Sequence, residues 1–439
     1  MTAEIAILNR TALAFAADSA ATLSGPRGSK TYDSAEKIFE LCRQQPIALM
    51  VFNNAEFMGV PLDVLVRKFR ESQEPHCGYE RLTDVWPAFL KFLENFPKDV
   101  DDEARHLSQF AFNVFNRIFE GANSLYFTQV TESFSRGRRV RRAFKNLDEL
   151  AIDLAGRHRQ QAEAQRLDGY LDDVLLEQFQ ERYGPHLDAI ITASARGIDV
   201  SEDLARALKA TMFAVIRSRS RSSGFTGFVF GGFGQEDLFP TLDSVELDGV
   251  YFDQVRVLVH ETIDIDRRGV TAAIVPFAQK DMPQRFIYGL DDALQNRIER
   301  IVGGVVDQIV AAKPRTYSRE VASEIRSAAS ASVRTALGEF KSESEQKLKS
   351  VVNFMSKREL AEIAYSLVEL TSRKRRFSDD QETVGGPIDV AVLTRNEGFI
   401  WIRRKHYFDA NLNPAYFVRN AEGRKNGHEP GKPLVSKPR

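Results

Sequence analysis

The sequence contains little cysteine, almost no net charge and no long hydrophobic run. Its two cysteines, Cys42 and Cys77, support neither a disulfide framework nor a cysteine-based zinc site. The 60 Lys and Arg residues nearly balance the 61 Asp and Glu residues, so no polyelectrolyte partner is implied for the chain as a whole. A membrane-spanning helix needs about 18 uninterrupted apolar residues, and the sequence has no such run.

What is present is typical of a globular protein: 439 residues, of which 43% are hydrophobic and 28% are charged. A chain of this length can bury a sizeable core, either as one large domain or as a domain that carries a large insertion. The opening segment lacks a basic region, and Asn9, Arg10 and Asp18 interrupt its apolar residues. We therefore expect no secretory signal, and we expect a soluble cytoplasmic protein.

The chain opens MTAEIAILNRTALAFAADSAATL, and this stretch predicts two strands. The apolar residues 5–8 and 12–17 are separated by the polar residues 9–11. Short apolar runs divided by a turn signal fit two buried adjacent strands better than they fit a helix. The second run ends at Asp18, and a polar hairpin with GPRG (residues 25–28) at its tip is expected to follow.

The next stretch contains a lysine, a third strand and a helix. Lys37 stands directly before the apolar pair Ile38-Phe39, and IALMVFNN (residues 47–54) predicts a buried strand. After it, five apolar residues recur at helical spacing: Val60, Leu62, Leu65, Val66 and Phe69.

This order of residues resembles β-type proteasome subunits and their bacterial proteasome-related branch, the Anbu-like proteins, which are N-terminal-nucleophile threonine hydrolases. In that family the mature chain begins with threonine, and an aspartate follows sixteen positions later. Thr2 and Asp18 have the same separation of sixteen positions. Lys37 corresponds to the family's lysine before an apolar pair, although the loop that leads to it is about three residues longer, an insertion of the kind that a surface hairpin tolerates.

Two later blocks extend the resemblance. Residues 226–250 (TGFVFGGFGQEDLFPTLDSVELDGV) resemble the family's paired strands around a glycine turn. Residues 356–402 resemble its late helix, its Gly-Gly and its last pair of strands. The three blocks cover less than half of the chain but keep the family's order. The fold implied is α+β, a four-layer αββα sandwich with large helical insertions.

Most of residues 83–219 and 291–370 show helical periodicity, which indicates that the insertions lie in these two stretches. The following organisation is expected: residues 2–75 as the N-terminal part of the core, 76–222 as a helical insertion, 223–290 as the central strands, 291–350 as a second helical insertion, 351–405 as the C-terminal helix and strands, and 406–439 as a partly disordered tail.

The resemblance implies a chemistry centred on Thr2. Once Met1 is removed, the free α-amine of Thr2 can take the proton of its own hydroxyl, since such an amine has a pKa near 8. Lys37 would lower the pKa of that amine and stabilise developing negative charge. Asp18 would hold Lys37 through a charge-assisted hydrogen bond. The first step would form an ester on Thr2, which water would then hydrolyse.

The backbone after the third strand should supply the oxyanion donor, and we assign the N–H of Asn53 to this role. The family has glycine at this place, but a backbone N–H serves with any side chain, and Asn tolerates unusual backbone angles. A second departure lies before Gly385-Gly386. Many active family members have an aspartate and a serine there, whereas this chain has Gln381 and Val384. The support that the family's aspartate and serine give to the threonine α-amine is therefore absent in this chain, or it comes from Ser378, Asp379, Asp380 or Glu382.

The expected function is threonine-dependent hydrolysis of amides in peptide or protein substrates, without metal or cofactor. The alternative is a catalytically silent, proteasome-like assembly or interaction module that retains the fold. The resemblance implies a homo-oligomer, possible use of an unidentified unfoldase and no membrane partner. A monomer whose insertions cap the helical layers is the other possibility.

Four further motifs favour structural roles. The basic runs at residues 135–145, 217–223 and 372–377 can contact phosphates, but charge runs more often pair with acidic neighbours, so nucleic acid is not an expected partner. HETID (residues 260–264) lacks the second histidine of a zinc-binding helix.

Overall fold

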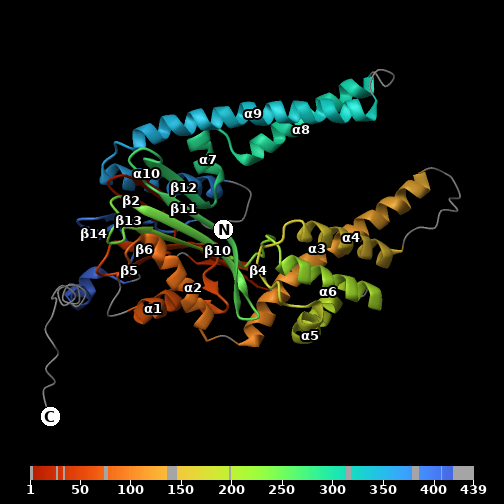
Figure 1. Ribbon diagram of the computed structural model, residues 1–439, viewed down its shortest axis with the longest axis horizontal. Helices are drawn as coiled ribbons and strands as arrows, with labels where there is room; N and C mark the ends of the chain where they lie inside the picture. The colour runs from red at the N-terminus through yellow and green to blue at the C-terminus, as the bar shows by residue number, and fades with distance from the viewer. Residues whose placement is uncertain are drawn as a thin grey trace, which may run out of the picture.

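The computed structural model describes residues 3–25, 28–32, 35–73, 78–97, 99–135, 146–196, 199–312, 318–377, 385–406 and 408–418. For residues 21–25, 28–32, 132–135, 319 and 410 it describes the backbone alone. Antiparallel sheets and many helices make up these parts of the chain (Figure 1). The predicted combination of α and β structure is confirmed.

The first five-stranded sheet has the order β12-β1-β2-β13-β14. Its strands are β1 (Ala3–Asn9), β2 (Leu13–Ala17), β12 (Ala272–Ala278), β13 (Asp389–Thr394) and β14 (Gly398–Arg403). The two strands predicted at the start of the chain are confirmed as the antiparallel pair β1 and β2. The turn between them is closed by Asn9, whose side-chain oxygen accepts a bond of 2.9 Å from the N–H of Thr11, as a short polar turn residue does.

The second five-stranded sheet has the order β11-β10-β9-β6-β5. Its strands are β5 (Ile38–Cys42), β6 (Ile47–Phe52), β9 (Thr226–Gly232), β10 (Thr241–Tyr251) and β11 (Gln254–Asp264). The third predicted strand is therefore confirmed, but it ends at Phe52 because Asn53 has a φ of 73°. The predicted pair of strands around the glycine turn is also confirmed as β9 and β10, which run antiparallel.

Two short hairpins complete the strands: β3 (Ala21–Gly25) with β4 (Gly28–Tyr32), and β7 (Glu56–Phe57) with β8 (Val60–Pro61). The first is the predicted polar hairpin, and Pro26 and Arg27 of its tip lie outside the described residues.

The two five-stranded sheets pack face to face. Buried side chains from both sheets form one cluster that includes Leu13 and Phe15 of β2, Met50 of β6 and Val229 of β9. The sheets approach so closely that a Cβ on Gly231 would lie 2.6 Å from the ring of Phe15. A residue with a side chain would not fit at this position without moving the facing strand.

Helices cover the outer face of each sheet. α7 (Asp281–Tyr288), α9 (Arg319–Val352) and α10 (Lys357–Arg376) contribute to a buried cluster with β1, β2, β12 and β13. α1 (Leu62–Gln73) and α2 (Val85–Asn95) form another with β5, β6, β9, β10 and β11. α1 begins at Leu62 and buries Leu65, Val66 and Phe69, so the predicted helix is confirmed with a start after Val60.

Four helices pack around a core of their own: α3 (Val100–Ser135), α4 (Leu147–Glu163), α5 (Leu176–Ala195) and α6 (Glu202–Ile216). This core also includes Tyr251 and Leu258, from β10 and β11, so the four helices are packed onto the second sheet. Short 3-10 helices occur at η1 (Leu82–Asp84) and η2 (Ala410–Leu412).

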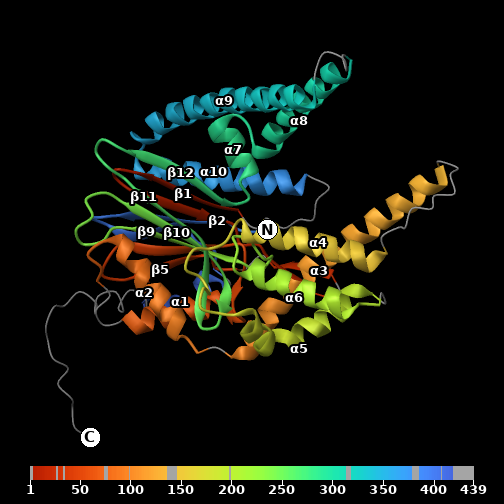
Figure 2. The same cartoon turned by 45° about the vertical axis from the view of Figure 1, so that its right-hand side comes forward.

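α8 (Asp292–Ala312) and α9 form a long hairpin that extends beyond the sheets, called the α8–α9 arm below. Figures 1 and 2 both show the arm on one side of the sheets and α3–α6 on the other. The edge of the packed sheets at which β1 starts, marked N, lies between these two groups of helices. Within the described ranges, no helix has the length and apolar character needed to cross a membrane.

Cys42, at the end of β5, is buried and disulfide-bonded. Two cysteines alone had given no reason to predict this bond, and Cys77 lies outside the described residues. Disulfides persist mainly in oxidising compartments. The expected cytoplasmic location therefore stays a prediction.

Aromatic packing beneath the second sheet provides a test of the fold. Phe89 of α2 is fully buried, with its ring centroid 4.9 Å from that of Phe69, 5.0 Å from Phe228 and 5.4 Å from Phe230. We expect Phe89→Ala to lower the free energy of unfolding by about 3–5 kcal/mol, because it leaves a cavity in a dense cluster. The control Phe127→Ala removes an exposed ring of α3 and should have little effect. Equal urea midpoints for the two variants would contradict this packing.

Candidate active site

Asp18 follows β2 and holds three segments of the chain together. Its buried carboxylate accepts hydrogen bonds from the Nζ of Lys37 at 2.5 Å and from the N–H of Ala3 at 3.0 Å, both at Oδ1. Its Oδ2 accepts bonds from the N–H of Gly385 at 3.0 Å and of Ala20 at 3.4 Å. A carboxylate with this many donors is fixed in position.

Lys37 stands directly before β5, and its side chain is only 6% exposed. Its Nζ lies 3.1 Å from Oε1 of Glu4 as well as 2.5 Å from Asp18. Its carbonyl accepts a bond of 2.9 Å from the N–H of Val51, which ties the lysine to β6. Burial by itself lowers the pKa of Lys37, but the carboxylates of Glu4 and Asp18 outweigh burial and raise that pKa above its usual value. Lys37 is therefore an ammonium at neutral pH.

Glu4 is a member of this cluster that sequence reasoning missed. It is fully buried in β1, where it pairs with Ala17 of β2. Alternate residues of a strand share a face, so Glu4 lies on the same face as Ala6 and Leu8, which pack between the two sheets. An acidic residue within a buried strand was the available signal, because such a charge is rarely buried without a partner.

Asn53 follows β6 in a conformation that few non-glycine residues adopt. Its φ is 73°, and the N–H of Asn54 donates a bond of 3.1 Å to the carbonyl of Phe52, so that Asn53 forms the centre of a tight turn. The side-chain amide of Asn53 donates to the carbonyl of Phe225 at 2.6 Å. Unfavourable backbone conformations of this kind cluster at functional sites, and they persist only where neighbouring groups hold them.

The structure brings the described site residues to the ends of neighbouring strands. Asp18 and Lys37 are in direct contact, and Asn53 lies two residues beyond Val51, which is bonded to the backbone of Lys37. Their catalytic roles stay predictions.

Thr2 lies outside the described residues, as do Ser378, Asp379, Asp380, Gln381, Glu382 and Val384. The first described residue is Ala3, and its N–H belongs to the peptide bond that joins it to Thr2. That N–H is the group that donates to Asp18 at 3.0 Å. The candidate site therefore includes one half of the Thr2–Ala3 linkage.

No protein-family model and no curated protein matches the sequence. Solved structures do match it. Anbu from Hyphomicrobium sp. strain MC1 is 11% identical, with 98% of this chain and 100% of that chain covered and a TM-score of 0.27. Anbu, described as an ancestral beta-subunit, from Yersinia bercovieri is 9% identical, with 99% and 100% covered and a TM-score of 0.27. The helical assembly of the Anbu complex from Pseudomonas aeruginosa is 10% identical, with 98% of each chain covered and a TM-score of 0.26.

All three of these structures are of Anbu. The resemblance predicted from the sequence is thereby confirmed. With TM-scores below 0.3, the match to Anbu places no individual residue of this chain. The chemistry of the site is inferred from the chain's own contacts.

Other candidate motifs are engaged by the protein itself. Arg217 lies 3.6 Å from Asp172 and stacks over a phenylalanine ring. Arg373 lies 2.8 Å from Glu369 on the same helix. Residues 136–145 of the first basic run lie outside the described residues. His260 lies in strand β11 and contacts a carboxylate of β10, not a metal-binding helix. Across the described part of the chain, no three His, Cys, Asp or Glu side chains are grouped so as to hold a metal ion.

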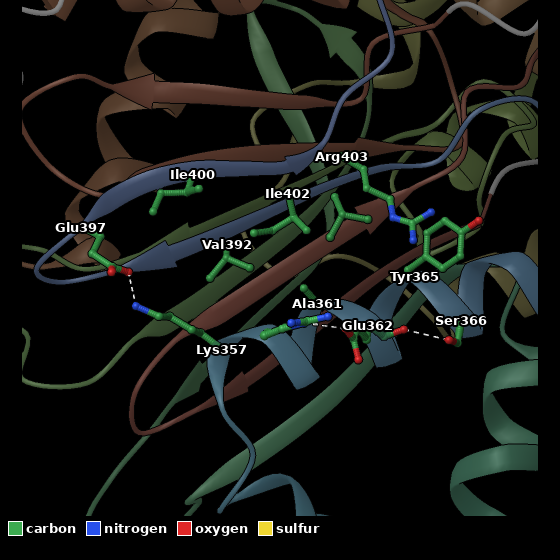
Figure 3. A pocket seen from close by; sticks show the side chains of 12 residues that line it. Lys357, Ala361, Glu362, Tyr365, Ser366, Val392, Glu397, Ile400, Ile402 and Arg403 are labelled. Atoms are coloured by element: carbon green, nitrogen blue, oxygen red, sulfur yellow. Dashed lines mark hydrogen bonds and ion pairs between the residues drawn. The ribbon is translucent and has the colours of Figure 1, made fainter.

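A pocket of about 760 Å³ lies elsewhere, between α10 and the outer face of β13 and β14 (Figure 3). Val392, Ile400 and Ile402 form its apolar wall, and the guanidinium of Arg403 lies 3.9 Å from the ring centroid of Tyr365 at one end. Since Lys37 and Glu4 face the space between the sheets, this pocket on the outer face is separate from the candidate active site.

The pairing of Lys37 with two carboxylates predicts how stability depends on pH. At pH 7, Lys37→Met should lower the free energy of unfolding by about 3–5 kcal/mol, because it leaves buried carboxylates without their cation. The pKa of Lys37 in the folded state is raised above its usual value of 10.5. Its stabilising contribution should therefore be fully present below pH 10.5 and be lost as the pH rises through the folded-state value.

Urea titrations of wild type and Lys37→Met between pH 7 and about pH 12 would measure this difference. Lys357→Met removes a lysine from a half-exposed pair with Glu397 and serves as the control, for which we expect little change. A Lys37→Met difference that grew with rising pH would contradict the assignment.

Proposed function

We propose that the protein is an N-terminal-nucleophile threonine hydrolase that cleaves amide bonds with Thr2. One observation carries the proposal. The carboxylate of Asp18 binds the ammonium of Lys37 and also the N–H of the residue joined to Thr2. Asp18, Lys37 and the start of β1 at Ala3 are thereby held together in a buried site, which supports this chemistry.

In this proposal each side chain has one task. The α-amine of Thr2, freed by removal of Met1, takes the hydroxyl proton of Thr2 as it attacks the amide carbonyl. Lys37 lowers the pKa of that amine and stabilises the oxyanion electrostatically. Asp18 and Glu4 keep Lys37 charged and in place, and the N–H of Asn53 donates to the oxyanion. The amine then protonates the leaving group, and water hydrolyses the ester on Thr2.

The arrangement of layers supports this proposal. Two antiparallel sheets pack face to face, and helices cover both outer faces. We propose that these layers are the four-layer αββα sandwich of N-terminal-nucleophile hydrolases. Residues 76–222 and 291–350 are then insertions into it, consistent with the separate core of helices α3–α6 and with the α8–α9 arm.

The proposed substrates are peptides or proteins. The chemistry uses no metal or cofactor, since the amine and the ammonium supply the proton transfer and the electrostatic stabilisation. An unfoldase partner and a cytoplasmic location stay predictions.

A catalytically silent assembly module is the second candidate. One face of α8 exposes Ile301, Val305 and Ile309, which are 58%, 48% and 53% exposed and are spaced four residues apart. An apolar stripe of this kind on a two-helix arm favours association with another surface. Self-association is compatible with both candidate functions.

We therefore expect the chain to form homo-oligomers, and we expect Ile301→Glu with Val305→Glu on α8 to weaken them, because charges disfavour burial of the stripe. Light scattering over a range of concentrations measures the change. A wild-type mass equal to one chain at every concentration would exclude self-association.

The decisive experiment concerns the first residues of the chain. We expect the intact mass to lack Met1, and a threonine-reactive epoxyketone or lactone probe to label Thr2. Thr2→Ala should reduce turnover of a fluorogenic peptide by about 1000-fold or more, because it deletes the nucleophile. Thr2→Ser should keep part of the activity, since hydroxyl and α-amine both remain.

Circular dichroism of each variant controls for folding. Turnover by Thr2→Ala equal to that of wild type, or an active protein that retains Met1, would exclude this mechanism. Absence of turnover and labelling in wild type would favour the assembly module.

A further inference from the structure

A second buried ion pair lies where helices α3–α6 join the second sheet. Arg256 of β11 is 0% exposed, and its guanidinium donates to three carbonyls at 2.6 Å each, those of Ile216, Ser218 and Ser220. These carbonyls belong to the end of α6 and to the segment that follows it. Arg256 therefore fixes the path of the chain as it leaves the helices and returns to the sheet.

Asp248 of β10 is the partner of Arg256. It is fully buried and accepts a bond of 2.5 Å from Nη1 of Arg256. It also accepts the N–H of Ser222 at 2.8 Å and the hydroxyl of the same serine. His106 of α3 lies 3.5 Å from this carboxylate, and burial lowers the pKa of its imidazole. A buried charge with so many partners is a rigid attachment point.

From Ser222 the bonds continue to the candidate active site. The Ser222 hydroxyl accepts a bond of 3.0 Å from the N–H of Gly224. The carbonyl of Gly224 accepts one of 3.2 Å from the side chain of Asn54. The next carbonyl, that of Phe225, accepts the bond of 2.6 Å from the side chain of Asn53. Residues 222–225 thus connect the buried ion pair to the turn at Asn53.

We propose that this network, which comprises Arg256, Asp248, residues 222–225 and Asn54, holds Asn53 in its left-handed conformation and so aims its N–H at the reacting carbonyl. The inference rests on the proposed function. A φ of 73° is uncommon for a residue other than glycine, although asparagine tolerates it better than most, so bonds from outside the turn help to keep Asn53 in this conformation. Ser222 and Asn54 are positioning residues, and the end of the helical segment becomes a support of the active site.

A merely structural role makes a different prediction. If the network only fastens α6 to the sheet, its loss would lower stability but leave the turn at Asn53 unchanged. Measuring kcat distinguishes the two possibilities. Misplacing one donor by a fraction of an ångström weakens transition-state stabilisation and so lowers kcat, while substrate binding changes little.

The test uses Ser222→Ala, which removes the hydroxyl but retains Asp248 and Arg256. We expect kcat for a fluorogenic peptide to fall by about tenfold with little change in KM. The matched control is Ser201→Ala, at the opposite end of α6. Ser201 also makes two side-chain bonds, to Asp148 at 2.7 Å and to the N–H of Leu204 at 3.1 Å, but it has no bond to residues 222–225. Its kcat should stay within about twofold of wild type.

A double-mutant cycle with Asn54→Ala tests whether both residues act through one connection. The double variant Ser222→Ala with Asn54→Ala should lose little more kcat than the more impaired single variant, whereas Ser201→Ala with Asn54→Ala should be additive. Unchanged kcat in Ser222→Ala, or additive losses in the first pair, would overturn the inference.

Amide hydrogen exchange gives a readout that does not depend on activity. Ser222→Ala should raise exchange in residues 52–56 as well as in 222–225, and Ser201→Ala should not. Faster exchange confined to residues 222–225 would overturn the inference even in an active enzyme. A wild-type protein without turnover or Thr2 labelling would instead overturn the proposed function, and exchange would still decide whether the network holds Asn53.

Discussion

A lysine buried between two carboxylates is the interaction on which the candidate site depends. Taking such charges out of water is costly, so the cluster is stable only if its hydrogen bonds are nearly complete. Glu4, Asp18 and Lys37 come from β1, from the end of β2 and from the residue before β5. The requirement that they meet fixes how the two sheets are placed at this end. The N–H of Gly385 also donates to Asp18, which ties the segment leading into β13 to this cluster.

The same rule applies where the helices join the sheet. Helices α3–α6 have their own apolar core, which reaches the sheet through Tyr251 and Leu258. Apolar packing is not directional, so it alone would permit small shifts of the helices over the strands. The Asp248–Arg256 pair lacks that tolerance, because a shift would leave a buried charge without a partner. Specific attachment therefore comes from the ion pair, and most of the burial comes from the core.

Much of the fold could be predicted from the sequence, because its signals are local. The apolar runs that became β1, β2 and β6 and the helical spacing in α1 each lie within a few neighbouring residues. The disulfide of Cys42 was not predicted, because pairing depends on the spatial separation of two residues and not on their number.

The site was only partly predictable for a related reason. Spacing identified Asp18 and Lys37, but Glu4 was overlooked beside the apolar run that follows it. The conformation of Asn53 and its bond to Phe225, a residue 172 positions away, depend on packing between distant segments. No local pattern contains that information, so the residues that support a site are harder to predict than those that form it.

The choice of lysine at the centre of the cluster follows from the number and direction of its donors. An ammonium has three N–H groups arranged around one atom. The nitrogen of Lys37 donates to Asp18 at 2.5 Å and lies 3.1 Å from Oε1 of Glu4. Three donors are enough for two carboxylates and one further acceptor. A planar guanidinium is larger, and its donors lie in one plane, so an arginine here could not satisfy both carboxylates and keep a donor directed at the same point. The two carboxylates thus do more than balance a charge: they hold the ammonium nitrogen at one position in the buried site.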